Sequence, residues 1–122
     1  MLNENGVQLT NQRKITALLM NVGVPVKSKG FEYIRRALCI SLERPEMLNS
    51  LTKLLYPEVA RLTGTTASCV ERNIRYALCT AWNMGGAKRF NNYIKLNVYN
   101  SQNITSGEFL AIATESILLG EL

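Results

Sequence analysis

Apolar residues recur along most of the chain at intervals of three and four residues, which is the period of an amphipathic α-helix. In the stretch 10–22, for example, one face collects Ile15, Leu18, Leu19 and Val22. The alternation of apolar and polar residues that is typical of a β-strand is nearly absent. The pattern therefore predicts an all-α fold.

The same periodicity locates the other helices and the breaks between them. Helices are predicted over 29–43, 46–55, 57–62, from the N-cap Thr66 to about Met84, over 87–93 and over 106–119. Glycines at Gly23-Val24-Pro25 and Gly85-Gly86 are expected to end two of them. Residues 95–99 are expected to be extended. We expect one domain over residues 10–122, a compact bundle of about six helices, after a flexible tail of residues 1–9.

The segment 54–82 has the spacing of a helix-turn-helix, in which two helices cross so closely that particular positions need particular residues. Ala60 is the small residue required where the second helix packs against the first. Gly64, four residues later, supplies the turn, and Val70 is a β-branched residue that packs back six residues on. The alternative is an ordinary helical hairpin with a glycine turn.

The second helix of this motif is predicted to bury one face and to present the other to DNA. The buried face collects Val70, Ile74, Ala77, Leu78 and Ala81. The opposite face collects Ser68, Cys69, Glu71, Arg72, Arg75 and Tyr76. An arginine there can donate two hydrogen bonds to guanine, and Glu71 can accept from cytosine or orient Arg75. The alternative for both arginines is a solvated ion pair with Glu71. The hydroxyls of Thr65, Thr66 and Ser68 suit phosphate contacts.

Three other side chains near this motif have two interpretations each. Cys69, at the exposed start of a helix, is either a redox-sensitive thiol or, as we prefer, a small neutral residue against DNA. Tyr56 and Trp82 could stack on the bases of single strands. Each lies in an apolar helical stripe, however, so we expect both to belong to the core or its boundary.

The distribution of charge favours a polyanionic partner. The net charge is +5, and residues 53–95 hold seven basic side chains against two glutamates. A basic patch on a small domain is typical of nucleic-acid binding, although a solvated basic face is the alternative. From this region we add Lys88 and Arg89 to the expected DNA contacts.

Composition argues against catalysis and against metal binding. The chain has no histidine and no aspartate, so a histidine-based triad, histidine-ligated zinc and an aspartyl-phosphate acceptor are excluded. Three cysteines show no metal-type spacing, and we expect free thiols, no metal and no cofactor. No apolar run approaches the about 20 residues of a membrane span, and no signal peptide is evident. We expect a cytoplasmic protein that is not an enzyme.

Several motifs together resemble the C-terminal DNA-binding effector domain of the stage-zero sporulation master response regulator, a transcription factor of endospore-forming Firmicutes. They are Gly23-Val24-Pro25, Lys29-Gly30-Phe31, Leu54-Leu55-Tyr56-Pro57, Gly64-Thr65-Thr66-Ala67-Ser68, Val70-Glu71-Arg72-Asn73-Ile74-Arg75 and Ser106-Gly107-Glu108-Phe109-Leu110-Ala111. The resemblance spans roughly 10–118. It implies a six-helix fold that reads promoter boxes in the major groove, often as tandem pairs, and that contacts an RNA polymerase sigma factor.

The resemblance also assigns particular positions. Glu71, Arg72 and Arg75 fall on positions that face DNA in the family, and the region 84–95 corresponds to the surface implicated in polymerase contact. Two departures are visible. Full-length members have a phosphoacceptor receiver, which this sequence does not contain, and the chain is expected to be either an excised effector domain or, as we prefer, a stand-alone paralogue. Where the family usually has arginine this chain has Cys69, which is expected to relax or alter the target sequence.

Two hypotheses follow for the function. The first is a sequence-specific transcriptional regulator that binds double-stranded DNA. One version of this hypothesis has the chain bind tandem sites as a homodimer. The alternative is a protein-interaction module that pairs with a full-length regulator or a sigma factor without reading DNA. Loss of the receiver and of the arginine before Val70 motivates this alternative.

Overall fold

The structure is a computed structural model that describes residues 4–94 and 104–120, and this part of the chain is all-helical. Its α-helices are α1 (Glu4–Val22), α2 (Lys29–Glu43), α3 (Tyr56–Thr63), α4 (Ala67–Asn83), α5 (Gly86–Ile94) and α6 (Ser106–Leu118). Between α2 and α3 lie a 3-10 helix, η1 (Pro45–Asn49), and a π-helical turn, η2 (Leu51–Leu55). The predicted all-α bundle with a helix-turn-helix is confirmed.

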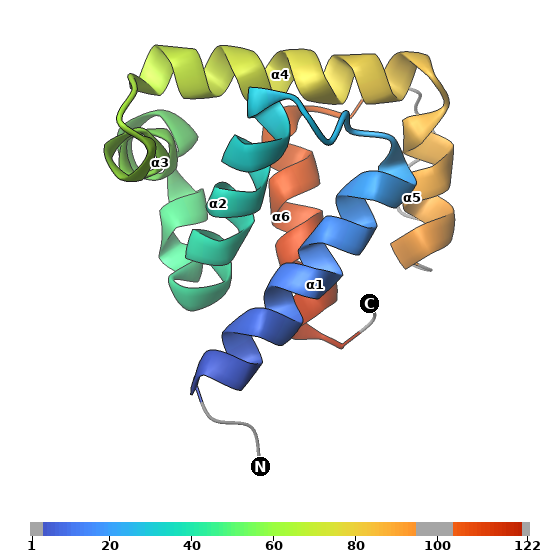
Figure 1. Ribbon diagram of the computed structural model, residues 1–122, viewed down its shortest axis with the longest axis horizontal. Helices are drawn as coiled ribbons and strands as arrows, with labels where there is room; N and C mark the ends of the chain where they lie inside the picture. The colour runs from blue at the N-terminus through green and yellow to red at the C-terminus, as the bar shows by residue number, and fades with distance from the viewer. Residues whose placement is uncertain (1–3, 95–103, 121–122) are drawn as a thin grey trace.

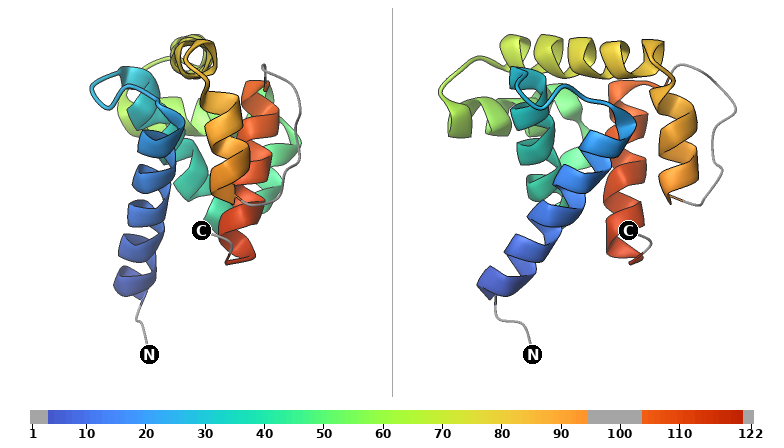
Figure 2. Two further views of the ribbon diagram at one scale, coloured as in Figure 1. Left: turned by 90° about the vertical axis from the view of Figure 1, so that its right-hand side faces the viewer. Right: turned by 45° about the vertical axis from the view of Figure 1, so that its right-hand side comes forward.

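Helix α4 lies across one end of the bundle, and the other long helices run away from it (Figure 1). Seen along the axis of α4, helices α1, α5 and α6 extend from the same side of it (Figure 2). The core lies in the space enclosed by the helices. Its fully buried side chains include Leu38, Ile74, Phe90, Phe109 and Leu110. One face of α4 is therefore anchored on the core, and the other is left to solvent.

An aromatic cluster joins α4, α5 and α6 at the centre of this core. Trp82 lies 5.7 Å from Phe109 and 6.5 Å from Phe90 between ring centroids. Its indole Nε1 donates a hydrogen bond of 2.7 Å to the Ile104 carbonyl oxygen. Since an indole N–H is costly to bury without an acceptor, this bond stabilises the core position of Trp82.

Most of the predicted helices are confirmed, with small shifts at their ends. Helix α2 has the predicted bounds, and α4 begins after the predicted N-cap Thr66. Helix α1 begins at Glu4, six residues before the predicted start at Thr10. The Thr10 hydroxyl donates to the Gly6 carbonyl within the helix, so Thr10 is an interior residue and does not cap. The expected extended segment 95–99 lies outside the described residues.

The prediction of one α-helix over 46–55 is wrong. Ser50 is extended, with φ −152° and ψ 110°, and it separates η1 from η2. Its side chain accepts a hydrogen bond from the backbone N–H of Lys53 and so starts a new helical turn. The apolar spacing continues across this break, which is why periodicity alone did not reveal it.

None of the described helices combines the length and the apolar character that are needed to cross a membrane.

Candidate nucleic-acid interface

The turn between α3 and α4 has the geometry that the sequence predicted. Gly64 has a left-handed backbone, with φ +70° and ψ 36°, and ends α3. The Thr65 N–H donates to the Ala60 carbonyl oxygen at 3.0 Å. Thr66 then caps α4 by accepting from the Cys69 N–H at 3.1 Å. Ala60 and Val70 are both buried, as the spacing of a helix-turn-helix requires.

Helix α4 divides into the two predicted faces. Its inward side chains, Val70, Ile74, Ala77, Leu78 and Ala81, are all buried. On the opposite face Ser68, Arg72, Arg75 and Tyr76 are exposed, and Cys69 and Glu71 are partly exposed. Tyr76 is 57% exposed, which is a high exposure for an aromatic side chain. The amphipathic division leaves a polar, partly basic face on a rigid helix.

Arg75 is held in place by two neighbours on the same helix. Its Nε donates to Glu71 Oε1 at 2.8 Å, and its guanidinium lies 5.0 Å from the ring centroid of Tyr76. The ion pair that was the alternative for Arg75 is therefore present, and it also orients the guanidinium. Arg72 forms no ion pair with another described residue. The two arginines therefore differ: one is oriented in advance and the other is unpaired within the described part of the chain.

Cys69 lies among groups that favour its thiolate. A hydrogen bond with the Thr65 side chain is the largest cause of a lowered pKa of the Cys69 thiol, and a bond with Tyr33 and the charges of Arg72 and Lys29 act in the same direction. Partial burial opposes them. Asn73 Nδ2 donates to the Cys69 carbonyl oxygen at 2.8 Å and lies 3.3 Å from its Sγ. The thiol is thus part of a polar cluster on one side of α4.

Tyr33 and Lys29 in this cluster belong to α2, and the sequence analysis did not connect them with α4. They lie about forty residues earlier in the chain, so no local spacing relates them to α4. The available signal was Gly30 between them, because a glycine inside a helical pattern often marks a close helix–helix approach. Residues that reach the site from another helix were therefore missed, whereas those on α4 itself were found.

The structure separates Lys88 from Arg89 in the α5 segment. Lys88 is exposed. Arg89 instead donates to the carbonyl oxygens of Asn21 at 3.0 Å, Val22 at 2.9 Å and Met84 at 2.7 Å. These acceptors end α1 and follow α4, so the guanidinium joins three helices. These bonds give Arg89 a structural role, and its DNA contact stays a prediction. Tyr56 and Trp82 are 4% and 8% exposed and belong to the core as preferred.

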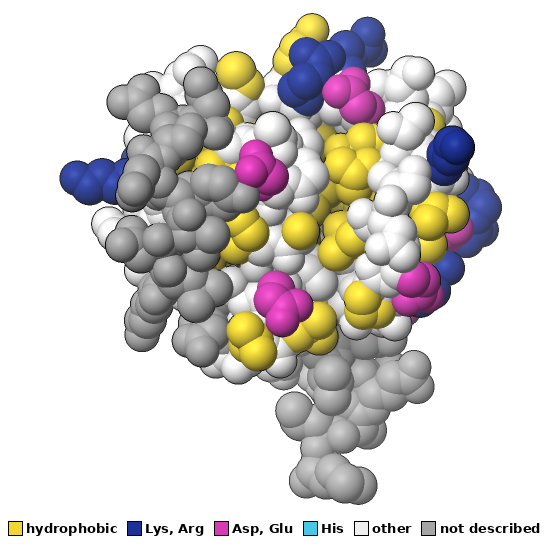
Figure 3. Space-filling model, turned by 180° about the vertical axis from the view of Figure 1, so that it is seen from behind, with side chains coloured by type: hydrophobic (Ala, Val, Ile, Leu, Met, Phe, Trp, Pro, Cys, Tyr) yellow, Lys and Arg dark blue, Asp and Glu magenta, His cyan; other side chains and the backbone are white. Residues whose placement is uncertain are grey.

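Seen from behind, Lys and Arg side chains gather at the upper edge of the molecule, along which α4 runs, beside an acidic side chain (Figure 3). The centre of this view is mainly apolar and neutral. Basic side chains also lie at the right and left edges of this view, so the basic surface includes the edge formed by α4 but is not confined to it.

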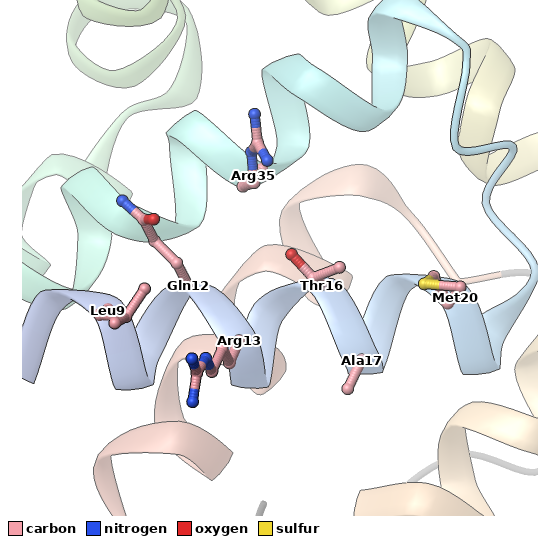
Figure 4. Close-up of a pocket in the computed structure, with 7 residues that line it drawn as sticks. All are labelled: Leu9, Gln12, Arg13, Thr16, Ala17, Met20 and Arg35. Atoms are coloured by element: carbon pink, nitrogen blue, oxygen red, sulfur yellow. The ribbon is translucent and has the colours of Figure 1, made fainter.

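A shallow hollow lies elsewhere, along α1 and facing α2 (Figure 4). Its volume is about 360 Å³, and its lining is largely apolar, with Leu9, Gln12, Arg13, Thr16, Ala17, Met20 and Arg35. None of the described residues that line it carries a carboxylate or a thiol. Within the described residues no group of three or more metal-ligating side chains is arranged to hold a metal ion.

Comparison with known protein families gives one match over most of the chain. Residues 15–117 match the model of a family described as the sporulation initiation factor Spo0A C terminal. The matched range contains α2 to α5 completely and nearly all of the interface described above.

Proposed function

The chain belongs to the Spo0A C-terminal domain family, and on this premise we propose that it regulates transcription by reading specific promoter boxes with α4. The family consists of DNA-binding domains that act in the regulation of sporulation, and it is not a family of enzymes. Within that family, sequence-specific reading by this particular chain is the step that we add.

The observation that supports the proposal is the exposed face of α4. An α-helix fits the major groove of B-DNA, and residues near the start of a recognition helix reach the base edges. Arg72 lies in the first half of α4 and Arg75 at its midpoint, and both are exposed, while the opposite face is anchored in the core. Arg75 is oriented by Glu71, so less conformational entropy is lost when it binds a base. Thr65, Thr66 and Ser68 lie at the N-terminal end of α4, where their hydroxyls suit phosphate contacts.

The wider arrangement of the complex follows as part of the same proposal. We propose binding to double-stranded DNA in tandem pairs, with the α5 segment, including the exposed Lys88, available to an RNA polymerase sigma factor. Such a regulator acts in the cytoplasm. Cys69 stands where the resemblance gives an arginine, and a thiol does not make the two-pronged contact of an arginine with guanine. The preferred sequence of this chain is therefore expected to differ from that of the family.

The decisive experiment selects binding sites from a random pool of duplex DNA and then measures variants on the selected site. Arg72→Ala and Arg75→Ala should each weaken specific binding by about 5–150-fold, which corresponds to the about 1–3 kcal/mol of a bidentate base contact. Binding to unrelated DNA should fall much less. Both side chains are exposed, so thermal unfolding should be nearly unchanged.

Arg44→Ala is the matched control. Arg44 is also an exposed arginine, but it caps the C-terminal end of α2, about 22 Å along that helix from its start next to α4. Its loss should leave site selection intact. If no sequence is enriched, or if both α4 variants bind the selected site as the parent does, α4 is not a reading helix. A pull-down with a full-length regulator then tests the protein-interaction alternative.

A further inference from the structure

The start of α2 is pressed against the middle of α4. A Cβ placed on Gly30 would lie 2.4 Å from the Asn73 carbonyl oxygen and 2.5 Å from the Ala77 Cβ. Only glycine lets the two backbones approach this closely. Lys29, the residue before it, therefore lies beside α4 at the level of Asn73, and it contributes to the electrostatic environment of Cys69.

A tight turn brings a second lysine to the same side. The Ser28 N–H donates to the Pro25 carbonyl oxygen at 3.1 Å, and the Ser28 hydroxyl donates to the same oxygen at 2.7 Å. Lys27 occupies a central position of this turn and is exposed, as is Lys29. In the view along α4, the segment from Gly23 to Ser28 lies beside that helix and near its level (Figure 2).

Both ammonium groups remain available to an external anion. Neither Lys27 nor Lys29 forms an ion pair with another described residue. The nearest acid in sequence, Glu32, is paired with Arg35 and Arg36. The first turn of α2 is itself capped, because Ser28 Oγ accepts from the Phe31 N–H at 3.1 Å. On this side of α4 the positive charge is therefore supplied by the side chains of Lys27 and Lys29 and not by free backbone N–H groups of α2.

The dimensions of DNA determine what this flank meets when α4 binds. The major groove is about 12 Å wide and an α-helix with its side chains is about 10–12 Å across, so one helix fills the groove. An element packed at the side of that helix, at its level, must then lie over the sugar–phosphate backbone that borders the groove. The α1–α2 turn and the start of α2 are such an element.

We propose that Lys27 and Lys29 form a phosphate clamp that holds the DNA backbone on the flank of α4 marked by Cys69 and Asn73. The clamp rests on the proposed function, since α4 must enter the groove for the lysines to reach the backbone. It fixes how deeply and at what angle α4 enters, and it adds affinity that does not depend on sequence.

The test measures affinity against salt concentration for the parent, Lys27→Ala, Lys29→Ala and the double variant. Each lost phosphate contact should lower the log–log salt slope by about 0.9. The affinity for the selected site and for unrelated DNA should fall by the same factor in each variant, because phosphates carry no sequence information. Lys29→Arg, which keeps the charge, should restore both the slope and the affinity.

Arg13→Ala is the matched control, since Arg13 is exposed and lies at the middle of α1, about 13 Å along that helix from its end at Val22. Its salt slope should equal that of the parent. If both lysine variants keep the parental slope while Arg72→Ala and Arg75→Ala lose specific binding, the clamp is overturned and the reading function of α4 stands. If the lysine variants lower the slope but no sequence is selected, the flank binds phosphate and the proposed reading function is overturned.

Discussion

At the scale of single residues, the thiols of Cys69 and Cys39 should titrate differently. The hydrogen bond with Thr65, joined by that with Tyr33 and by nearby cations, lowers the pKa of the Cys69 thiol. Burial raises the pKa of the Cys39 thiol. Because the thiolate is the nucleophile, Cys69 should be alkylated faster at neutral pH, and its rate should rise at lower pH than that of Cys39. Mass spectrometry of iodoacetamide-treated protein across a pH series measures both rates.

The neighbours of Cys69 provide the control. Thr65→Val removes the hydroxyl and should move the rise in the Cys69 rate to higher pH, while the Cys39 rate stays the same. If specific DNA also protects Cys69 from alkylation, the thiol lies within the bound surface. Equal alkylation profiles for Cys69 and Cys39 would contradict the environment described for Cys69.

The same site shows what sequence can and cannot specify at this scale. Arg72, Arg75 and Glu71 were placed on one face because helical period fixes the relative direction of residues on a single helix. The pairing of Arg75 with Glu71 is a contact between residues four apart and was foreseen as an alternative for that reason. The approach of Tyr33 and Lys29 depends on how α2 crosses α4, and no spacing within either helix contains that information.

At the scale of elements, the crossing of α2 and α4 should depend on a single glycine. Gly30→Ala would place a methyl group against backbone atoms of Asn73, which have no freedom to move aside. We expect a loss of about 1–3 kcal/mol in the free energy of unfolding, as for an overpacked core position. Urea denaturation with an unchanged m-value measures the loss.

Gly107→Ala is the comparison, because Gly107 also occupies the second position of its helix, α6. Its added Cβ would meet only the end of the Leu51 side chain, at 3.2 Å. Alanine is favoured over glycine in a helix by about 0.5–1 kcal/mol, so this variant should be as stable as the parent or slightly more stable. A Gly30→Ala variant that matches Gly107→Ala in stability would show that α2 and α4 are not in such close contact.

The elements also show why helix ends are predictable where caps are local. Thr66 caps α4, and the capping box of Thr105 with Glu108 begins α6 where the spacing predicted a start. These signals act within four residues. The segment 46–55 has the apolar spacing of one continuous helix. Ser50 offers a local alternative, because its side chain accepts from the Lys53 N–H and begins a new helical turn. Which of the two forms there depends on the packing of η1 and η2 against the rest of the molecule.

At the scale of the whole molecule, the fold brings exposed cations of α4 and of the turn before α2 to the same end of the bundle (Figure 1). Arg72 and Arg75 lie on α4, whereas Lys27 and Lys29 lie in the turn before α2 and at its start. The two pairs come close to one another only because α2 packs against α4 in the folded chain. Net charge read along the sequence located the basic middle third but omitted Lys27 and Lys29, which lie in the first third of the chain.

The junction of α1, α4 and α5 gives the last prediction, which concerns Arg89. Its guanidinium donates to three carbonyl oxygens at the ends of α1 and α4, and the backbone of Gly23 leaves room for it, since a Cβ there would lie 2.7 Å from Arg89 Nη2. Carbonyls at helix C-termini attract a cation, and removing it leaves them short of donors. Arg89→Ala should therefore lower the free energy of unfolding by about 1–3 kcal/mol, whereas exposed Lys88→Ala should change it by less than about 0.5 kcal/mol.

Chemical denaturation of both variants measures the structural role of Arg89. DNA affinity, measured at denaturant concentrations well below the unfolding midpoints, measures any contact with DNA. An Arg89→Ala variant that is as stable as the parent but binds DNA weakly would return this arginine to the DNA interface, because the carbonyl contacts would then contribute nothing that the fold requires.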